Sequence, residues 1–210
     1  MLRLVGRFVK LLVGLFLFGM GIWLGLQAHL GVGPWDVLHG GLAKRLGTPF
    51  GLTAIGVSVV VFLISLVARV RPGIGTVLNV LCIGAVIDLL LSTPWFDGVG
   101  DGPMALRLLT TAAGIVSVAV GSALYLGAHL GPGPRDGLMV ALHQRTGWKV
   151  GVARSVLECT ALLVGVLLGG PVGIGTIAFA LGIGPAVQVA FTVLRQTPSR
   201  IPSAEVEVPL

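Results

Sequence analysis

Residues 28–36 read AHLGVGPWD and residues 128–136 read AHLGPGPRD, so the chain contains one stretch twice at an offset of 100 residues. A second motif keeps the same offset, because GIGT occupies residues 73–76 and again residues 173–176. Self-similarity at a fixed period is the mark of a repeated structural unit, and it has to be settled before a fold is assigned. The chain is therefore predicted to hold two copies of one module, residues 1–95 and 106–195, joined by a linker, 96–105.

The composition is that of an integral membrane protein. Of the 210 residues, 55% are hydrophobic and only 10% are charged, with a mean hydropathy of +1.00, whereas a soluble domain is about one quarter charged. The net charge of +6 does not indicate a nucleic-acid partner, because the basic residues gather at the ends of apolar runs and are not interleaved with aromatic residues. The expected partner is the lipid bilayer. The two cysteines, Cys82 and Cys159, lie inside apolar runs and form no CxxC motif.

Six apolar runs approach the roughly 20 helical residues that a bilayer crossing takes. Three lie in each copy, at residues 11–30, 51–68 and 74–91 and at residues 106–130, 150–168 and 174–194. The first run follows basic residues as in a signal peptide, but it has a counterpart in the second copy and is expected to be retained. Between the first two runs of each copy, residues 35–46 and 135–146 start after a proline and end at a glycine, which are helix start and stop signals. Each of these short helices would be about 18 Å long, too short to cross.

An odd number of crossings in a tandem module makes the second copy insert upside down. We therefore expect an all-α membrane protein with six transmembrane helices as two inverted three-helix repeats, each with an extra short helix after its first span. With the N-terminus in the cytoplasm, eleven of the 14 Lys and Arg residues fall on the cytoplasmic side, as the positive-inside rule requires. The C-terminus is then cytoplasmic as well, the linker is extracytoplasmic, and residues 196–210 form a disordered cytoplasmic tail.

The GxGPxD turns allow two interpretations. Glycine permits unusual backbone angles, proline suits a first helical turn, and a following carboxylate can accept unpaired N–H bonds, so a capped helix start explains the motif completely. Alternatively, inverted-repeat transporters place interrupted helices at the midplane with half-helix N-termini facing the solute, and such N-termini favour anionic groups. The solute-binding candidates on this second interpretation are Gly31, Gly33, Pro34 and Asp36 and, in the second copy, Gly131, Gly133, Pro134 and Asp136.

The GIGT turns open the third span of each copy and are equally ambiguous. A tight turn with threonine near the helix N-cap is one interpretation. The other adds a second helix N-terminus from each module to the solute site. The candidates are Gly73, Gly75 and Thr76 and their counterparts Gly173, Gly175 and Thr176.

Four ionisable residues are candidates for proton coupling. Glu158 lies about 12 Å into a predicted span, where a carboxylate is a functional-site hypothesis by default. Arg154 is four residues earlier on the same helical face, so an internal ion pair is the alternative. His29 and His129 precede the two turns, where each is either interfacial or part of a titrating pair with the aspartate seven residues further on.

At GVGPWD, residues 31–36, and PGIGT, residues 72–76, the chain resembles the YczE-like family of bacterial integral membrane proteins, within the YczE/YyaS/YitT group. The resemblance extends over residues 11–194, and the second copy departs from the motif at Arg135, the counterpart of Trp35. It implies a location in the bacterial plasma (inner) membrane. It implies no mechanism and transfers no catalytic residues.

The expected function is that of a small secondary transporter or channel-like carrier for a small polar solute, an anionic one included, with its site between the two repeats. The alternatives are a non-transporting membrane scaffold or regulator of a partner enzyme, and a lipid-handling protein. No enzyme motif, cofactor site or metal site is recognisable in the sequence. Glycine pairs at a spacing of four, Gly21 with Gly25 and Gly165 with Gly169, suit close helix contacts within the bundle or between the protomers of a homo-oligomer.

Overall fold

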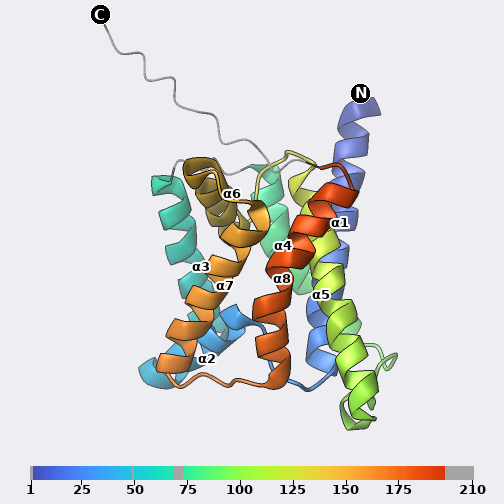
Figure 1. Cartoon of the computed structure of the whole chain (residues 1–210), viewed down its shortest axis with the longest axis vertical. Helices are drawn as coiled ribbons and strands as arrows, with labels where there is room; N and C mark the ends of the chain where they lie inside the picture. The colour runs from blue at the N-terminus through green and yellow to red at the C-terminus, as the bar shows by residue number, and fades with distance from the viewer. Residues whose placement is uncertain (1, 49, 69–72, 197–210) are drawn as a thin grey trace, which may run out of the picture.

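The computed structural model describes residues 2–48, 50–68 and 73–196. Within these ranges the chain is all helical and contains no strand (Figure 1). The first copy contributes α1 (Leu2–Gln27), α2 (Pro34–Leu46), α3 (Phe50–Val67) and α4 (Ile74–Leu91), followed by the short 3₁₀ helix η1 (Val99–Asp101). The second copy contributes α5 (Met104–Leu126), α6 (Pro134–Thr146), α7 (Val150–Leu167) and α8 (Ile174–Val193). The predicted disordered tail lies outside the described residues, except for Gln196.

Among the residues that the structure describes, five helices are long and apolar enough to cross a membrane. They are Leu4–Gln27 in α1, Ile74–Leu91, Met104–Leu126, Val150–Leu167 and Ile174–Val193. In α3 the apolar stretch among the described residues is shorter, Gly56–Val67. The prediction of an all-α membrane protein is thus confirmed, whereas the sixth crossing and the inverted insertion remain predictions.

The two short helices owe their ends to the motif residues. In α2 the N-cap is Gly33 and the first helical residue is Pro34, whose missing N–H is not needed at this position. The helix stops at Gly47, which adopts the left-handed region at φ 66°. The same three roles fall to Gly133, Pro134 and Gly147 in α6. In Figure 1 the two short helices lie at opposite ends of the bundle, α2 at the bottom and α6 at the top.

α1 and α5 cross closely because glycines face each other at the contact. A Cβ atom built on Gly21 would lie 2.6 Å from the carbonyl oxygen of Gly114, and one on Gly114 would lie 2.7 Å from that of Gly21. Gly121 meets Gly14 in the same way at 2.6 Å. Such contacts admit no side chain. Of the predicted pair at spacing four, Gly21 makes this contact, whereas a Cβ atom on Gly25 would meet nothing within 4 Å.

The second predicted glycine pair shows the same division. A Cβ atom on Gly165 in α7 would lie 2.5 Å from the backbone nitrogen of Leu38 in α2, so this glycine lets the two helices touch. Gly169 instead lies in the turn after α7, where it adopts a left-handed backbone angle, φ 82°. Both useful glycines therefore act between the two copies within one chain.

The GIGT turn of each copy binds the GxGPxD turn of the other copy. The amide of Gly75 donates to the carbonyl of Leu130 at 2.7 Å, and that of Gly175 donates to Leu30 at 2.8 Å. The hydroxyl of Thr76 donates to the carbonyl of Pro132, and that of Thr176 donates to Val32, both at 2.7 Å. Each threonine oxygen also accepts its own turn's Gly73 or Gly173 amide. The two motifs of the repeat thus form one reciprocal contact, made twice.

Two arginines repeat this reciprocity at the ends of α1 and α5. Arg7 donates to the carbonyls of Ala128 and His129. Arg107 donates to the carbonyls of Ala28 and His29 at 2.9 and 2.7 Å. A cation at these positions satisfies carbonyls that a helix end leaves without partners. The equivalent arginine of each copy therefore closes the helix end of the other copy.

Candidate functional site

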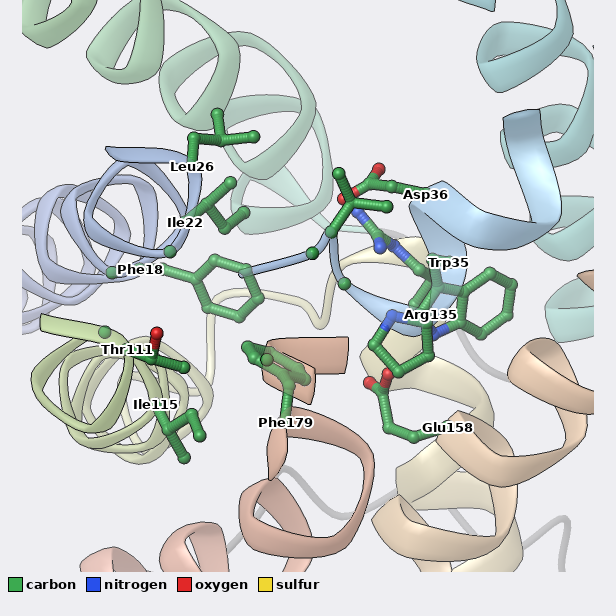
Figure 2. Close-up of a pocket in the computed structure, with 18 of the residues that line it drawn as sticks. Phe18, Ile22, Leu26, Trp35, Asp36, Thr111, Ile115, Arg135, Glu158 and Phe179 are labelled. Carbon is green, nitrogen blue, oxygen red and sulfur yellow. The ribbon is translucent and has the colours of Figure 1, made fainter. Parts of the chain in front are cut away.

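A cavity of about 50 Å³ lies between the two copies, enough for a few water molecules or a small solute. Residues of the first copy come from α1, α2 and the turn between them, and those of the second copy come from α5, α6, α7 and α8 (Figure 2). The lining consists of Phe18, Gly21, Ile22, Gly25, Leu26, Gly31, Val32, Gly33, Pro34, Trp35, Asp36, Thr111, Gly114, Ile115, Arg135, Arg154, Glu158, Gly175 and Phe179.

The cavity has one apolar side and one polar side. Figure 2 shows the apolar side chains of α1, α5 and α8 together, opposite the polar and charged residues of α2, α6 and α7. The apolar side is formed by Phe18, Ile22, Leu26, Ile115 and Phe179, and the polar side by Trp35, Asp36, Arg135 and Glu158. A site with these two sides suits a molecule that has an apolar part and a polar part.

A buried charged cluster supports the polar side. Glu158 is 1% exposed, and its Oε1 lies 2.9 Å from Nε of Arg154. Arg154 also pairs with Asp136, whose other oxygen accepts a hydrogen bond from the hydroxyl of Tyr125. Buried charges persist when they are paired in this way. The guanidinium of Arg154 is therefore shared by the carboxylates of Glu158 and Asp136, and Asp136 has the Tyr125 hydroxyl as a further donor.

Glu158 remains incompletely satisfied. The indole of Trp35 reaches its carboxylate from the first copy, but Oε2 has no hydrogen-bond partner of normal geometry among the described residues. A buried acceptor without a partner costs about 1–3 kcal/mol. Glu158 is one of the residues that line the cavity, so this incompletely satisfied carboxylate belongs to the cavity wall.

The two copies differ at a position that lines the cavity. Tyr125, three residues before the AHL stretch of the second copy, is fully buried and reaches Asp136 with its hydroxyl. Its counterpart in the first copy is Gly25, which lines the cavity that extends to Asp36, the counterpart of Asp136. A Cβ atom on Gly25 would meet nothing within 4 Å. A tyrosine side chain is thus replaced by open space beside the first aspartate.

Other differences between the copies enlarge the contrast. The side chain of Asn79, on α4 of the first copy, packs against Gly133 in the turn of the second copy, so a Cβ atom on Gly133 would collide with it. The counterpart of Asn79 is Phe179, which lines the cavity. Trp35 and Arg135 are also counterparts, and the guanidinium carbon of Arg135 lies 5.4 Å from the centre of the Trp35 ring, within cation–π range. The site beside Asp136 in the second copy is therefore filled by protein side chains, whereas the corresponding site beside Asp36 in the first copy contains the cavity.

The solute-binding residues predicted from the motifs divide accordingly. Five of them line the cavity: Gly31, Gly33, Pro34, Asp36 and Gly175. The others lie outside its lining and serve the contact between the copies or the charged cluster, namely Gly73, Gly75, Thr76, Gly131, Gly133, Pro134, Asp136, Gly173 and Thr176. The first GxGPxD stretch thus lines this cavity along its whole length, whereas the second contributes Arg135 to the lining.

The proton-coupling candidates divide as well. Glu158 and Arg154 form the predicted ion pair and both line the cavity. His29 and His129 lie in the turns with positive φ angles of 51° and 54°, outside the cavity lining. Asp36 contacts His39, with Oδ1 and Nδ1 3.5 Å apart, and Asp136 contacts Arg154 and Tyr125. The side chains that the structure places against the two aspartates are thus His39 for Asp36, and Arg154 and Tyr125 for Asp136.

Comparison with known proteins places the chain in a family. A family model described as "Family of unknown function (DUF6198)" matches residues 5–192. The chain belongs to this family. An uncharacterised protein of Haemophilus influenzae is 37% identical over 90% of this chain and 84% of its own length. No solved structure matches the chain.

Two relatives in Bacillus subtilis confirm the YczE-like resemblance seen in the motifs. The uncharacterised membrane protein YczE is 33% identical over 87% of this chain and 84% of its own length. The uncharacterised protein YyaS is 25% identical over 79% of this chain and 82% of its own length. The membrane character of the YczE relative agrees with the apolar helices of this DUF6198 member.

Proposed function

We propose that this protein is a small secondary transporter or channel-like carrier whose polar solute binds in the cavity between the two copies. The observation that carries the proposal is the position of Glu158. This carboxylate is buried in an apolar helix and lines a cavity, and beside the approaching Trp35 indole its Oε2 has no hydrogen-bond partner of normal geometry in the described part of the chain. Intramembrane ionisable groups that face an internal cavity mark solute and ion pathways.

The proposed arrangement in the membrane is that of two inverted repeats with six crossings, in a bacterial plasma membrane, with both termini in the cytoplasm. The antiparallel course of α1 and α5 and the opposite positions of α2 and α6 support it (Figure 1). Inverted-repeat carriers hold the solute between the repeats and expose it by rocking one repeat against the other. The reciprocal turn contacts would act as the joint between the two bodies.

Glu158 is the proposed coupling residue. Its Oε1 lies 2.9 Å from Nε of Arg154, and its Oε2 has no hydrogen-bond partner of normal geometry among the residues that the structure describes. A proton or a solute donor would bind Oε2. Competition between the two for one carboxylate would link solute movement to proton movement. Arg154 would stay paired with Asp136 while Glu158 exchanges its partner, so its proposed role is to hold the charged cluster together.

Thermal unfolding of the detergent-purified protein against a panel of small metabolites and ions tests the proposal. A solute that binds only the folded state at 100 times its dissociation constant adds about 2.7 kcal/mol of stability. The stabilisation should disappear in Glu158→Gln and in Gly25→Tyr, which fills the cavity as Tyr125 fills its counterpart. Asp97→Asn, at an exposed position in the linker, is the matched control and should keep the response. A panel that gives no response with wild-type protein would favour a scaffold or regulator of a partner enzyme instead.

Lipid handling is a second candidate, favoured by one observation. A larger apolar cavity of about 520 Å³ lies along α2 and α3, and Trp35 lines both it and the central cavity. This apolar space suits an acyl chain. Native mass spectrometry should then find a retained lipid that is lost in Val57→Trp, which narrows the space. Equal lipid retention by both proteins would exclude this function.

A further inference from the structure

We infer that the solute is an organic cation with an apolar body, whose N–H donors bind the carboxylates of Glu158 and Asp36. The inference rests on the proposed function and specifies the chemistry of the same site. The side chains around the cavity favour a cation over the anionic solute that the helix N-termini suggest.

The charges around the cavity favour a cation. The charged cluster and the cavity lining together contain three carboxylates, on Asp36, Asp136 and Glu158, but two guanidinium groups, on Arg135 and Arg154. Each arginine is already engaged, Arg154 by two carboxylates and Arg135 by the face of the Trp35 ring. A single positive charge brought into the cavity balances the set, whereas an anion would add to the excess of negative charge.

The free hydrogen-bonding capacity also favours a donor. Glu158 is 1% exposed and presents Oε2, an acceptor without a donor of normal geometry, at a group that lines the cavity. Asp36 lines the same cavity with its side chain 36% exposed and has His39 3.5 Å away. Ammonium and guanidinium groups carry donors and no acceptor. They complement such carboxylates with short, charge-assisted hydrogen bonds.

In the second copy, the side chain of Tyr125 occupies the place that the bound cation is proposed to take in the first copy. There, the aromatic body of Tyr125 lies within the core, and its hydroxyl donates to Asp136. In the first copy, Gly25 leaves that volume open beside Asp36. A bound molecule with an apolar body and a terminal donor would occupy the same relative place. The aromatic rings of Phe18 and Phe179 on the apolar side would receive the body.

Three probes with one propyl chain separate the charge classes. Propylguanidinium is cationic over the whole working pH range, propylurea is a neutral molecule of similar shape, and butyrate is anionic. Each is titrated against the full-length purified protein, and the melting temperature is recorded for wild type, Glu158→Gln, Asp36→Asn and the control Asp97→Asn.

We expect propylguanidinium to raise the melting temperature saturably in wild type and in Asp97→Asn. Its apparent affinity should fall at least tenfold in Glu158→Gln and should weaken in Asp36→Asn. It should also weaken as the pH is lowered, since protons compete for the Glu158 carboxylate, whose neighbours are the indole of Trp35 on α2, Arg135 and Asp136 on α6, and Arg154 on its own helix.

The contrary results are distinct. If butyrate or propylurea stabilises the protein as well as propylguanidinium does, and the response needs Glu158, the cationic class is wrong while a solute site remains. If propylguanidinium stabilises Glu158→Gln and wild type equally, the assigned carboxylate is wrong. If none of the three probes stabilises wild type while another polar solute of the wider panel does, the inference fails and the carrier proposal stands; no response to any solute removes both.

Discussion

Thr76 and Thr176, one hundred residues apart, make the same hydrogen bond in opposite directions between the two copies. Each hydroxyl donates at 2.7 Å to a carbonyl in the other copy's turn, Pro132 for Thr76 and Val32 for Thr176. Both side chains are buried, at 6% and 0% exposure. The GIGT motif therefore recurs because each copy needs it to hold its neighbour.

Replacement of either threonine by valine should destabilise the protein by about 1–3 kcal/mol, because a buried carbonyl loses its donor while the side-chain shape is kept. The reciprocal geometry predicts similar losses for Thr76→Val and Thr176→Val. Chemical unfolding in a fixed detergent measures them, with Thr76→Ser and Thr176→Ser as controls that retain the hydroxyl. Valine variants as stable as the serine variants would show that these bonds contribute nothing.

The α1–α5 crossing should tolerate a methyl group at Gly25 of α1 but not at Gly21. In Gly21→Ala the added carbon would meet Gly114 backbone at 2.6 Å, which should cost about 1–3 kcal/mol as the helices move apart. In Gly25→Ala, one turn further along, it meets nothing within 4 Å. Melting temperatures of the two variants make the comparison. A larger loss for Gly25→Ala would contradict the described packing.

The sequence predicted the helices well because their signals are local. Apolar runs, prolines and glycines set the ends, so the expected short helix 135–146 and the observed α6, Pro134–Thr146, differ by one residue. Membrane character and the YczE-like family are confirmed. The division into modules and the inverted insertion stay predictions, since the insertion of the chain in a bilayer is not a property of its helices alone.

The site was less predictable because it depends on contacts between residues of the two copies that are far apart in the sequence. The spacing of four residues, about one helical turn, predicted the Arg154–Glu158 pair, but Asp136 joins it from another helix, 18 residues away in the chain. The reciprocal arginines, Arg7 and Arg107, carried no motif. One signal was visible at the offset of 100: Tyr125 stands where the first copy has Gly25. Differences between copies, more than their shared glycines, marked the cavity.

Tyr125 should matter for the stability of the charged cluster. In Tyr125→Phe the ring stays, but Asp136 loses its hydroxyl donor. A loss of about 1–3 kcal/mol is expected in thermal or chemical unfolding. The double variant Tyr125→Phe with Asp136→Asn should not show the sum of the two single losses, because the groups share one network. Strict additivity would mean that the two side chains act independently.

Stability should depend on His129 at mildly acid pH. Burial lowers the pKa of its imidazole from the ordinary value of 6.5, and the charges of Arg7 and Lys10 lower it further. The unfolded chain then binds a proton below about pH 6.5 that the folded chain resists, so this group favours unfolding as the pH falls and has no such effect above pH 6.5. His129→Asn, which tolerates the positive φ, should reduce the fall in melting temperature between pH 7.5 and pH 5.5. An unchanged fall would exclude His129 as its source.

The most direct test of the account is whether water reaches the cavity between the copies in an intact membrane. Single cysteines are placed at Val32, which lines the cavity, and at Val118, which is 0% exposed in the core, after Cys82 and Cys159 are replaced by serine. A small cationic thiol reagent should modify the cysteine at position 32 in membrane vesicles and leave that at position 118 unmodified. Gly25→Tyr should protect position 32 by filling the cavity. Equal lack of reaction at both positions would show a sealed core and contradict a solute site between the two copies.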